Sequence, residues 1–138
     1  MSVQIPEKFD ELIASAQHVW FTTVREDGMP QPTPVWFVRD GSTFLIYTSP
    51  GSQKVANIRA NPHVALGWAT EDSGNFVVAQ GEARIDESTP PPNQMRAYIE
   101  KYSEGIAEIG MTPESFTETF SLPIRVTPLH VRGEVEEA

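Results

Sequence analysis

Apolar residues first recur at helical spacing and then, from residue 18 on, gather in short runs that are typical of β-strands. Ile5, Phe9, Leu12 and Ile13 predict a short amphipathic helix over residues 5–16. Six later segments are rich in β-branched and aromatic residues and are predicted to be strands: 18–24, 34–38, 43–48, 64–68, 76–85 and 124–131. Further helices are expected over residues 52–60, around Tyr98 and from Thr112 onward.

Tight turns join most of the predicted strands. Asp27-Gly28 and Asp40-Gly41 supply the positive φ that hairpin turns need. Prolines at 30, 32 and 34 cannot donate ladder hydrogen bonds, so this segment is expected at a sheet edge or in a bulged entry. Because long βαβ crossovers are missing, the pattern predicts a mainly β fold: one domain over 1–138, a six-stranded antiparallel barrel with peripheral helices.

Composition narrows the possible partners. The 138 residues carry 10 basic and 19 acidic side chains, a net charge of −9, which disfavours nucleic acid and anionic membranes. No apolar run is long enough to span a membrane, and the N-terminus lacks a signal-peptide pattern, so a cytoplasmic location is expected. The chain has no cysteine and its three histidines lack metal-ligand spacing, which argues against a metal site.

A candidate anion site lies where the strand at 43–48 ends. The loop contains Thr48, Ser49 and Ser52, and Lys54 falls in the first turn of the next predicted helix. Hydroxyls, an ammonium and free backbone N–H groups at a helix start are the chemistry that binds a phosphate monoester, although the P-loop spacing is absent. The alternative is that Ser52 only caps the helix and Lys54 is solvated.

Three aromatic residues on separate strands surround this loop. Trp36, Tyr47 and Trp68 are candidates for the wall of a pocket that takes a flat conjugated ring, with burial in the core as the alternative. The sequence shows no Gly-x-Ser-x-Gly elbow and no focused carboxylate pair. An enzyme of this kind would therefore take its chemistry from a cofactor.

The order of several short motifs resembles the pyridoxamine 5′-phosphate oxidase-like family of flavin-binding split β-barrels. The segments that carry this resemblance are residues 23–30, 34–38, 47–49, 54–58, 61–66 and 125–128. The form Pro-Val-Trp-Phe, followed by Lys-Val-x-Asn-Ile-x-x-Asn-Pro, is most similar to the branch that uses coenzyme F-420, a deazaflavin.

The resemblance implies a homodimer with cofactor sites between the subunits. It implies that the following residues contact the cofactor: Thr33, Pro34, Val35 and Trp36 on one strand, and Thr48, Ser49, Ser52 and Lys54 around the phosphate. Two departures matter. The chain ends without the arginine-rich motif of vitamin B6 oxidases, and Phe76 stands where those oxidases place a flavin-contacting Gln, which weakens the case for FMN.

The expected function is an oxidoreductase that uses reduced coenzyme F-420 to transfer a hydride to a small conjugated acceptor. One alternative is the same fold with FMN. Another is a dimer that holds a flavin, deazaflavin or haem without turnover, since no general acid is evident in the sequence. A substrate-sized cavity beside the ring site would favour the enzyme. Trp20, Trp36 and Trp68 give the barrel more large apolar surface than its few helices can cover, which is a second reason to expect a homodimer.

Overall fold

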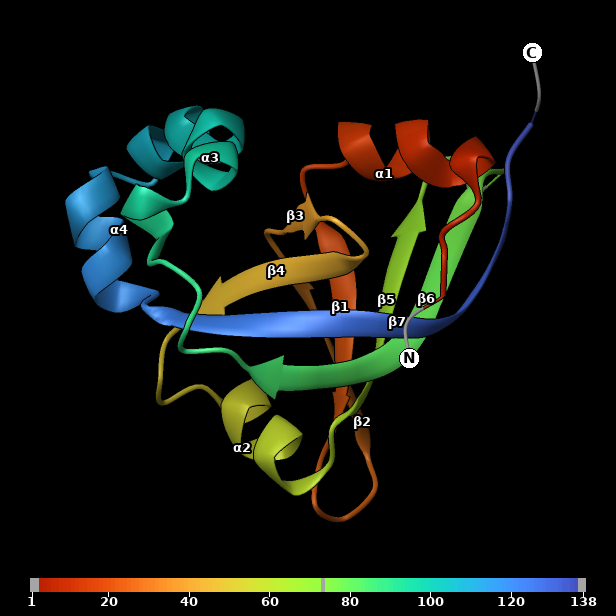
Figure 1. Cartoon of the computed structure of the whole chain (residues 1–138), viewed down its shortest axis with the longest axis horizontal. Coiled ribbons are helices and arrows are strands. Elements are labelled where there is room, and N and C mark those ends of the chain that lie inside the picture. The colour runs from red at the N-terminus through yellow and green to blue at the C-terminus, as the bar shows by residue number, and fades with distance from the viewer. Residues whose placement is uncertain (1–2, 73, 137–138) are drawn as a thin grey trace.

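A single curled antiparallel sheet with helices at its margins makes up the fold (Figure 1). The computed structural model describes residues 3–72 and 74–136. The strands are β1 (Val19–Val24), β2 (Pro30–Val35), β3 (Val38–Asp40), β4 (Thr43–Thr48), β5 (His63–Ala69), β6 (Phe76–Ile85) and β7 (Leu122–Glu134). The helices are α1 (Asp10–Ser15), α2 (Gln53–Ala60), α3 (Arg96–Glu108) and α4 (Pro113–Thr119), with 3-10 turns η1 (Glu7–Phe9) and η2 (Pro92–Gln94).

The order of strands forces the sheet to curl. It runs β2-β1-β5-β6-β7-β4-β3, so β2 and β3 lie at opposite edges although only residues 36 and 37 separate them in sequence. Three Cα steps of ~3.8 Å join Val35 to Val38, a reach of about 11 Å. Six gaps of ~4.8 Å across a flat sheet would place the two edges about 29 Å apart. The sheet therefore curves until its edges approach each other.

The predicted single strand over 34–38 is wrong, and the described residues form seven strands rather than six. Residues 30–35 form β2 against β1, and residues 38–40 form β3 against β4. Trp36 and Phe37 turn the chain from one pair to the other. Local sequence could not reveal this break, because every residue in the segment is compatible with a strand and only the two partners decide it. The proline-rich segment does lie at a sheet edge, as expected.

Two apolar clusters fill the fold on the two sides of β4. Inside the curled sheet lie Phe37, Phe44, Ile46, Leu66, Trp68, Val77, Ile124 and Val126, together with residues of α1 and α2. Between β4 and the α3–α4 pair lie Leu45, Tyr47, Tyr98, Tyr102, Ile106 and Phe116. Because β4 is covered on both faces, its sequence is continuously apolar instead of alternating. Figure 1 shows α3 and α4 together at one margin and α1 at another.

Local signals at the turns and helix starts agree with the structure. Gly28 and Gly41 have positive φ values, 89° and 62°. Thr112 caps α4 in a capping box with Ser115, and Pro113 occupies the first turn. In the part of the chain that the structure describes, no helix has the length and apolar character needed to cross a membrane.

Gly81 has a packing role that a larger residue cannot fill. A bulge interrupts the β6–β7 ladder between Gln80 and Gly81, and a Cβ atom at Gly81 would lie 2.0 Å from the Thr127 carbonyl oxygen. The Gly81→Ala substitution is expected to lower the free energy of unfolding by about 3 kcal/mol, because backbone must shift. Chemical denaturation measures this. Gly51→Ala is the control: nothing lies within 4 Å of its Cβ position, so equal losses for both variants would contradict the close packing.

Candidate functional site

A pocket of about 330 Å³ opens between strands β2 and β4 and the α3–α4 pair. We call it the aromatic pocket. Its lining residues are His18, Pro34, Val35, Trp36, Tyr47, Thr48, Lys54, Tyr98, Ile109, Phe116 and Phe120. Five of the residues expected to contact a cofactor therefore meet here: Pro34, Val35, Trp36, Thr48 and Lys54. Pro34, Val35 and Trp36 come from β2 and the link after it, whereas Thr48 and Lys54 flank the loop between β4 and α2. The curl of the sheet brings these two segments together.

Trp36 forms a rigid wall of this pocket. Its ring stacks on Tyr102 with a centroid distance of 4.6 Å and an interplanar angle of 6°, and on Phe116 at 5.6 Å and 13°. Its indole Nε1 donates a hydrogen bond to His18 Nε2 at 3.3 Å. Gly105 on α3 allows the close approach, since a Cβ there would lie 3.1 Å from the indole. The indole is thus held in place by its neighbours before any ligand binds.

The tyrosines of the pocket are neutral at physiological pH. Tyr47 donates its hydroxyl proton to the Pro90 carbonyl and meets Tyr98 edge-on at 4.9 Å. Burial raises the pKa of Tyr47 to about 12 and raises that of Tyr98 as well. The part of the pocket wall that these two rings form is therefore apolar and uncharged, which suits a flat conjugated ring.

Lys54 stands where the aromatic pocket meets a second, polar hollow of about 440 Å³, and it lines both. Its side chain is half-buried, and burial lowers the pKa of its ammonium. Within residues 3–72 and 74–136, Lys54 forms no ion pair with a carboxylate. A half-buried cation without a partner is a strong attractor for an anionic group of a ligand.

The hydroxyl groups near Lys54 are arranged differently from the expectation. Thr48 Oγ1 and Ser52 Oγ lie 3.1 Å apart and share a hydrogen bond. In the described structure the Ser52 side chain accepts no hydrogen bond from the first turn of α2, so the view of Ser52 as a side-chain cap is wrong. Ser49 contributes its carbonyl, which accepts from Ser52 N at 3.1 Å in the turn. Of the three hydroxyl residues, Thr48 lines the aromatic pocket, whereas Ser49 and Ser52 are not among the residues that line this pocket or the polar hollow.

Trp68 does not reach the pocket. It is 3% exposed and packs inside the curled sheet, against Phe37 at 5.6 Å and Phe44 at 5.1 Å between ring centroids. The expected aromatic wall of Trp36, Tyr47 and Trp68 is therefore wrong for Trp68. On β5 its side chain points to the inner face of the sheet, a direction set by the strand register and not by residue type.

Sequence reasoning missed a buried amide that organises the polar hollow. Asn57 on α2 is 2% exposed, and its Nδ2 donates to Thr23 Oγ1 at 2.9 Å and to Gln31 Oε1 at 2.8 Å. Gln53 Nε2 donates to Asn57 Oδ1 at 2.9 Å. Thr23, Gln31, Gln53 and the predicted Thr33 all line this hollow. A polar residue on the apolar face of a helix, next to Ile58, was the signal that could have indicated it.

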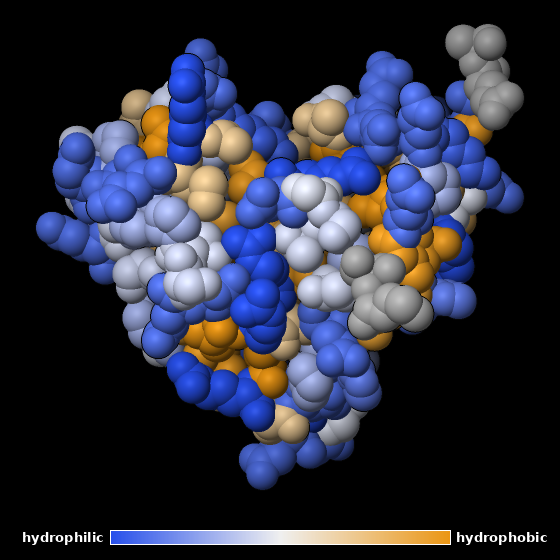
Figure 2. All heavy atoms as spheres, in the orientation of Figure 1, coloured by the Kyte–Doolittle hydropathy of each residue, from blue (hydrophilic) through white to orange (hydrophobic). Residues whose placement is uncertain are grey.

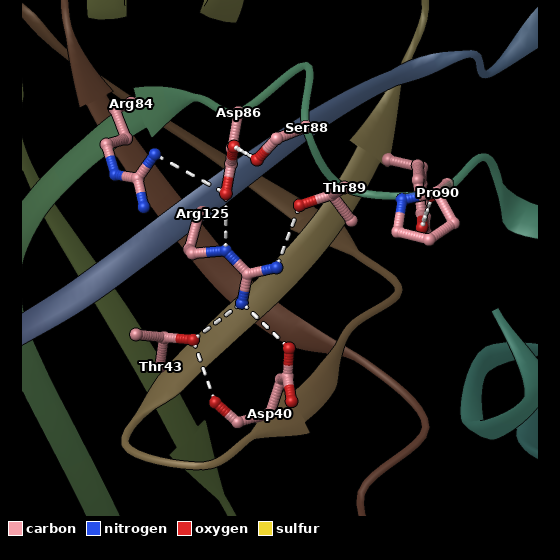
Figure 3. Close-up of polar contacts among 9 residues, drawn as sticks. Asp40, Thr43, Arg84, Asp86, Ser88, Thr89, Pro90 and Arg125 are labelled. Carbon is pink, nitrogen blue, oxygen red and sulfur yellow. Dashed lines mark hydrogen bonds and ion pairs between the residues drawn. The ribbon is translucent and has the colours of Figure 1, made fainter.

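A partly buried arginine, Arg125, fastens the loop that contains Asp86 and Thr89 (Figure 3). Arg125 Nε donates to Asp86 Oδ2 at 2.9 Å, and its Nη2 donates to Thr89 Oγ1 at 2.8 Å. Its Nη1 group donates to Asp40 and Thr43 on the β3–β4 hairpin. Since Thr89 directly precedes Pro90, the carbonyl partner of Tyr47, the Arg125 cluster fixes one wall of the aromatic pocket from behind.

The comparisons with known proteins agree with this architecture. The sequence matches the family described as pyridoxamine 5′-phosphate oxidase over residues 5–131. Among solved structures, an F-420 reductase is 25% identical with a TM-score of 0.73, covering 93% of this chain and 98% of that one. No curated protein matches the sequence. The expected mainly β split-barrel fold is thereby confirmed.

Two more distant structures bear on the fold alone. A conserved hypothetical protein from Mycobacterium tuberculosis is 19% identical with a TM-score of 0.72, covering 96% of this chain and 85% of that one. HutZ, the haem storage protein from Vibrio cholerae, is 12% identical with a TM-score of 0.65, covering 94% of each chain. Proteins with different ligands thus share this architecture.

The Arg125 cluster predicts how stability depends on pH. The Ser88 hydroxyl, together with Arg125, holds the pKa of the Asp86 carboxyl well below its usual range. A carboxyl with a depressed folded-state pKa stabilises the fold above its unfolded pKa of about 4, and this contribution is lost as pH falls further. As the pH falls from 5 to about 2, the free energy of unfolding should therefore decrease. Asp86→Asn should lower the free energy of unfolding at pH 7 and should make it depend less on pH in this acid range.

Denaturant titration at several pH values measures this effect. Glu100→Gln is the matched control, because Glu100 forms an exposed ion pair with Arg96 and such pairs contribute little to stability. An acid slope that is the same in Asp86→Asn as in the wild type would show that the cluster does not carry the pH dependence.

Proposed function

We propose that this chain, which belongs to the pyridoxamine 5′-phosphate oxidase family, is an oxidoreductase that uses reduced coenzyme F-420 to reduce a small conjugated acceptor. The single observation that carries the proposal is the position of Lys54. Its unpaired, half-buried ammonium stands between an apolar pocket shaped for a flat ring and a polar hollow. A ligand with a conjugated ring, an anionic group and a polar extension matches the apolar pocket, the Lys54 ammonium and the polar hollow, in that order.

The residues present fit such a cofactor. Trp36, Tyr47 and Val35 offer apolar contact to the ring, and Lys54 with Thr48 offers a cation and a hydroxyl to the phosphate. Beyond Lys54, amide groups of Gln31 and Gln53 line the polar hollow and suit the polar part of the molecule. When bound, the deazaflavin supplies the two-electron chemistry, and the chain's own residues bind it, orient it and exclude water from its ring.

Three observations support coenzyme F-420 over FMN. The Pro-Val-Trp-Phe and Lys-Val-x-Asn-Ile motifs resemble the F-420-dependent branch, and the F-420 reductase is 25% identical. Phe76 begins β6 at the place expected for a flavin-contacting Gln. The polar hollow also extends past Lys54, so a ligand can continue beyond its phosphate, as FMN does not. FMN is the alternative cofactor in the same site.

Haem storage without turnover is the alternative in a different class, as the fold shared with HutZ suggests. The two adjoining hollows favour a deazaflavin over haem, because they match a ring and a polar extension and haem has no such extension. No group of three or more acidic and histidine side chains in the described residues is placed to bind a metal ion.

Fluorescence titration of the purified apoprotein with coenzyme F-420 and with FMN tests the proposal. Coenzyme F-420 is expected to bind more tightly. Lys54→Ala is expected to weaken binding tenfold to a hundredfold, since a charge-assisted hydrogen bond contributes about 1.5–3 kcal/mol. Folding should hardly change, because a cation in the first turn of α2 faces the positive end of the helix dipole.

Lys8→Ala is the control for net charge, since Lys8 is exposed and lies outside both hollows. If Lys54→Ala binds as tightly as the wild type at low salt, the anionic group does not bind here. Equal or tighter binding of FMN would favour the flavin alternative, and haem binding without either cofactor would favour storage.

We also propose that two copies associate through the outer face of the sheet. Trp20 is 57% exposed, whereas Trp36 is partly buried in the aromatic pocket and Trp68 is buried in the core, so Trp20 is the member of the expected trio on the outer surface. Trp20 pairs with Pro34 on β2 and Gly67 on β5, and Gly67 pairs with Val78 on β6. Directly paired residues point to the same face, so the four form one apolar row. Pro34 also lines the aromatic pocket, so a second copy on this row would cover its mouth.

Light scattering at micromolar concentration should give twice the mass of one chain. Trp20→Arg is expected to yield a folded monomer, because an arginine at the centre of an apolar interface is costly to desolvate. Met29→Arg is the control: Met29 is equally exposed, at 58%, but lies in the turn before β2. A monomeric wild type would rule out both the interface and a site shared between subunits.

A further inference from the structure

A second cavity, of about 290 Å³, lies between α1, β3 and α3, away from the aromatic pocket. We call it the α1–α3 cavity. Its lining residues are Asp10, Ile13, Ala14, Phe37, Val38, Arg39, Ala97 and Lys101. In Figure 1, β3 lies between the two helices, and Figure 2 shows the surface dipping between them. The volume corresponds to about ten water molecules at ~30 Å³ each, enough for a small organic molecule.

The cavity combines an apolar floor with one uncompensated positive charge. Arg39 Nη1 lies 2.8 Å from Asp10 Oδ1, so these two charges neutralise each other. Lys101 Nζ donates to the Phe37 carbonyl at 3.0 Å and lies 3.7 Å from the centroid of the Phe37 ring. No carboxylate pairs with Lys101 anywhere in residues 3–72 and 74–136. Its ammonium keeps donors free for a ligand.

The charge on Lys101 depends on pH within an accessible range. Burial lowers the pKa of Lys101 to about 8, so the ammonium dominates at neutral pH and is lost above it. The charged groups that face it from neighbouring elements are Asp10 on α1 and Arg39 on β3, which pair with each other. Tyr102, adjacent on α3, has a pKa raised to about 12 by burial and stays neutral across this range.

We propose that the α1–α3 cavity is a binding site for a small amphipathic carboxylate. The carboxylate pairs with Lys101 Nζ, and the apolar body lies against the exposed side chains of Ala14 and Ala97. The site is separate from the aromatic pocket but shares its wall. Trp36 and Tyr98 line that pocket, whereas the adjacent Phe37 and Ala97 line this cavity.

An NMR titration with hexanoate as the probe tests the site in the wild-type chain. Hexanoate is expected to shift the amide signals around Phe37 and Lys101. Hexanamide, which has the same apolar body without the charge, should bind at least tenfold more weakly. Affinity for hexanoate should fall as pH rises from 7 to 9.5, because the ammonium is deprotonated over this range.

Two variants test separately the charge of Lys101 and the free volume of the α1–α3 cavity. Lys101→Met keeps an apolar stem and should weaken hexanoate binding at least tenfold, with Lys8→Met as the exposed-lysine control that binds like the wild type. Lys101→Met also removes a hydrogen bond to Phe37, so Ala97→Phe is the second variant: it fills the cavity from an exposed position and retains Lys101. Ala97→Phe should abolish hexanoate binding.

The proposal is overturned if hexanoate binds Lys101→Met or Ala97→Phe as tightly as it binds the wild type. Equal binding of hexanamide, or an affinity that stays constant between pH 7 and 9.5, would overturn it as well. Since cofactor binding depends on Lys54 and not on Lys101, failure here leaves the proposed oxidoreductase unaffected.

Discussion

The hydroxyl group of Tyr102 holds both backbone polar groups of Phe37, in the two-residue link between the opposite edges of the sheet. Tyr102 Oη accepts from Phe37 N at 2.9 Å, and it lies within donating distance of the carbonyls of Phe37, at 2.9 Å, and Gln17, at 2.8 Å. The two Phe37 groups are buried, so leaving either of them without a partner would cost about 1–3 kcal/mol. The two edges of the sheet meet at this junction, so these hydrogen bonds help to hold the sheet curled.

The same junction separates the aromatic pocket from the α1–α3 cavity, which lie on either side of α3. Trp36 stacks on Tyr102 and faces the aromatic pocket, whereas Phe37 lies under Lys101 and faces the α1–α3 cavity. The short, rigid link of Trp36 and Phe37 thus positions one wall of the aromatic pocket and one wall of the α1–α3 cavity. Few residues can vary here, because a Cβ at position 105 would lie 3.1 Å from the indole and the Phe37 ring also meets Phe44 and Trp68 in the core.

Electrostatics sets the second constraint. A chain with net charge −9 repels anions at a distance, so binding of an anionic molecule must depend on local groups. The fold supplies them by partly burying two of its three lysines, Lys54 and Lys101, without carboxylate partners in the described residues. Burial strengthens an interaction with an opposite charge, since the local dielectric is lower than that of water.

The sequence by itself determined the local features: the strand segments, the Asp-Gly turns, the capped start of α4, and the Ser/Gly loop followed by Lys54. These depend on backbone preferences within a few residues, which a single chain displays. The tertiary structure alone decided that residues 34–38 divide between two strands and that Trp68 faces the core. It also decided that Asn57 binds Thr23 and Gln31. Each of these depends on strand register and on partners distant in sequence, and local propensity carries no information about either.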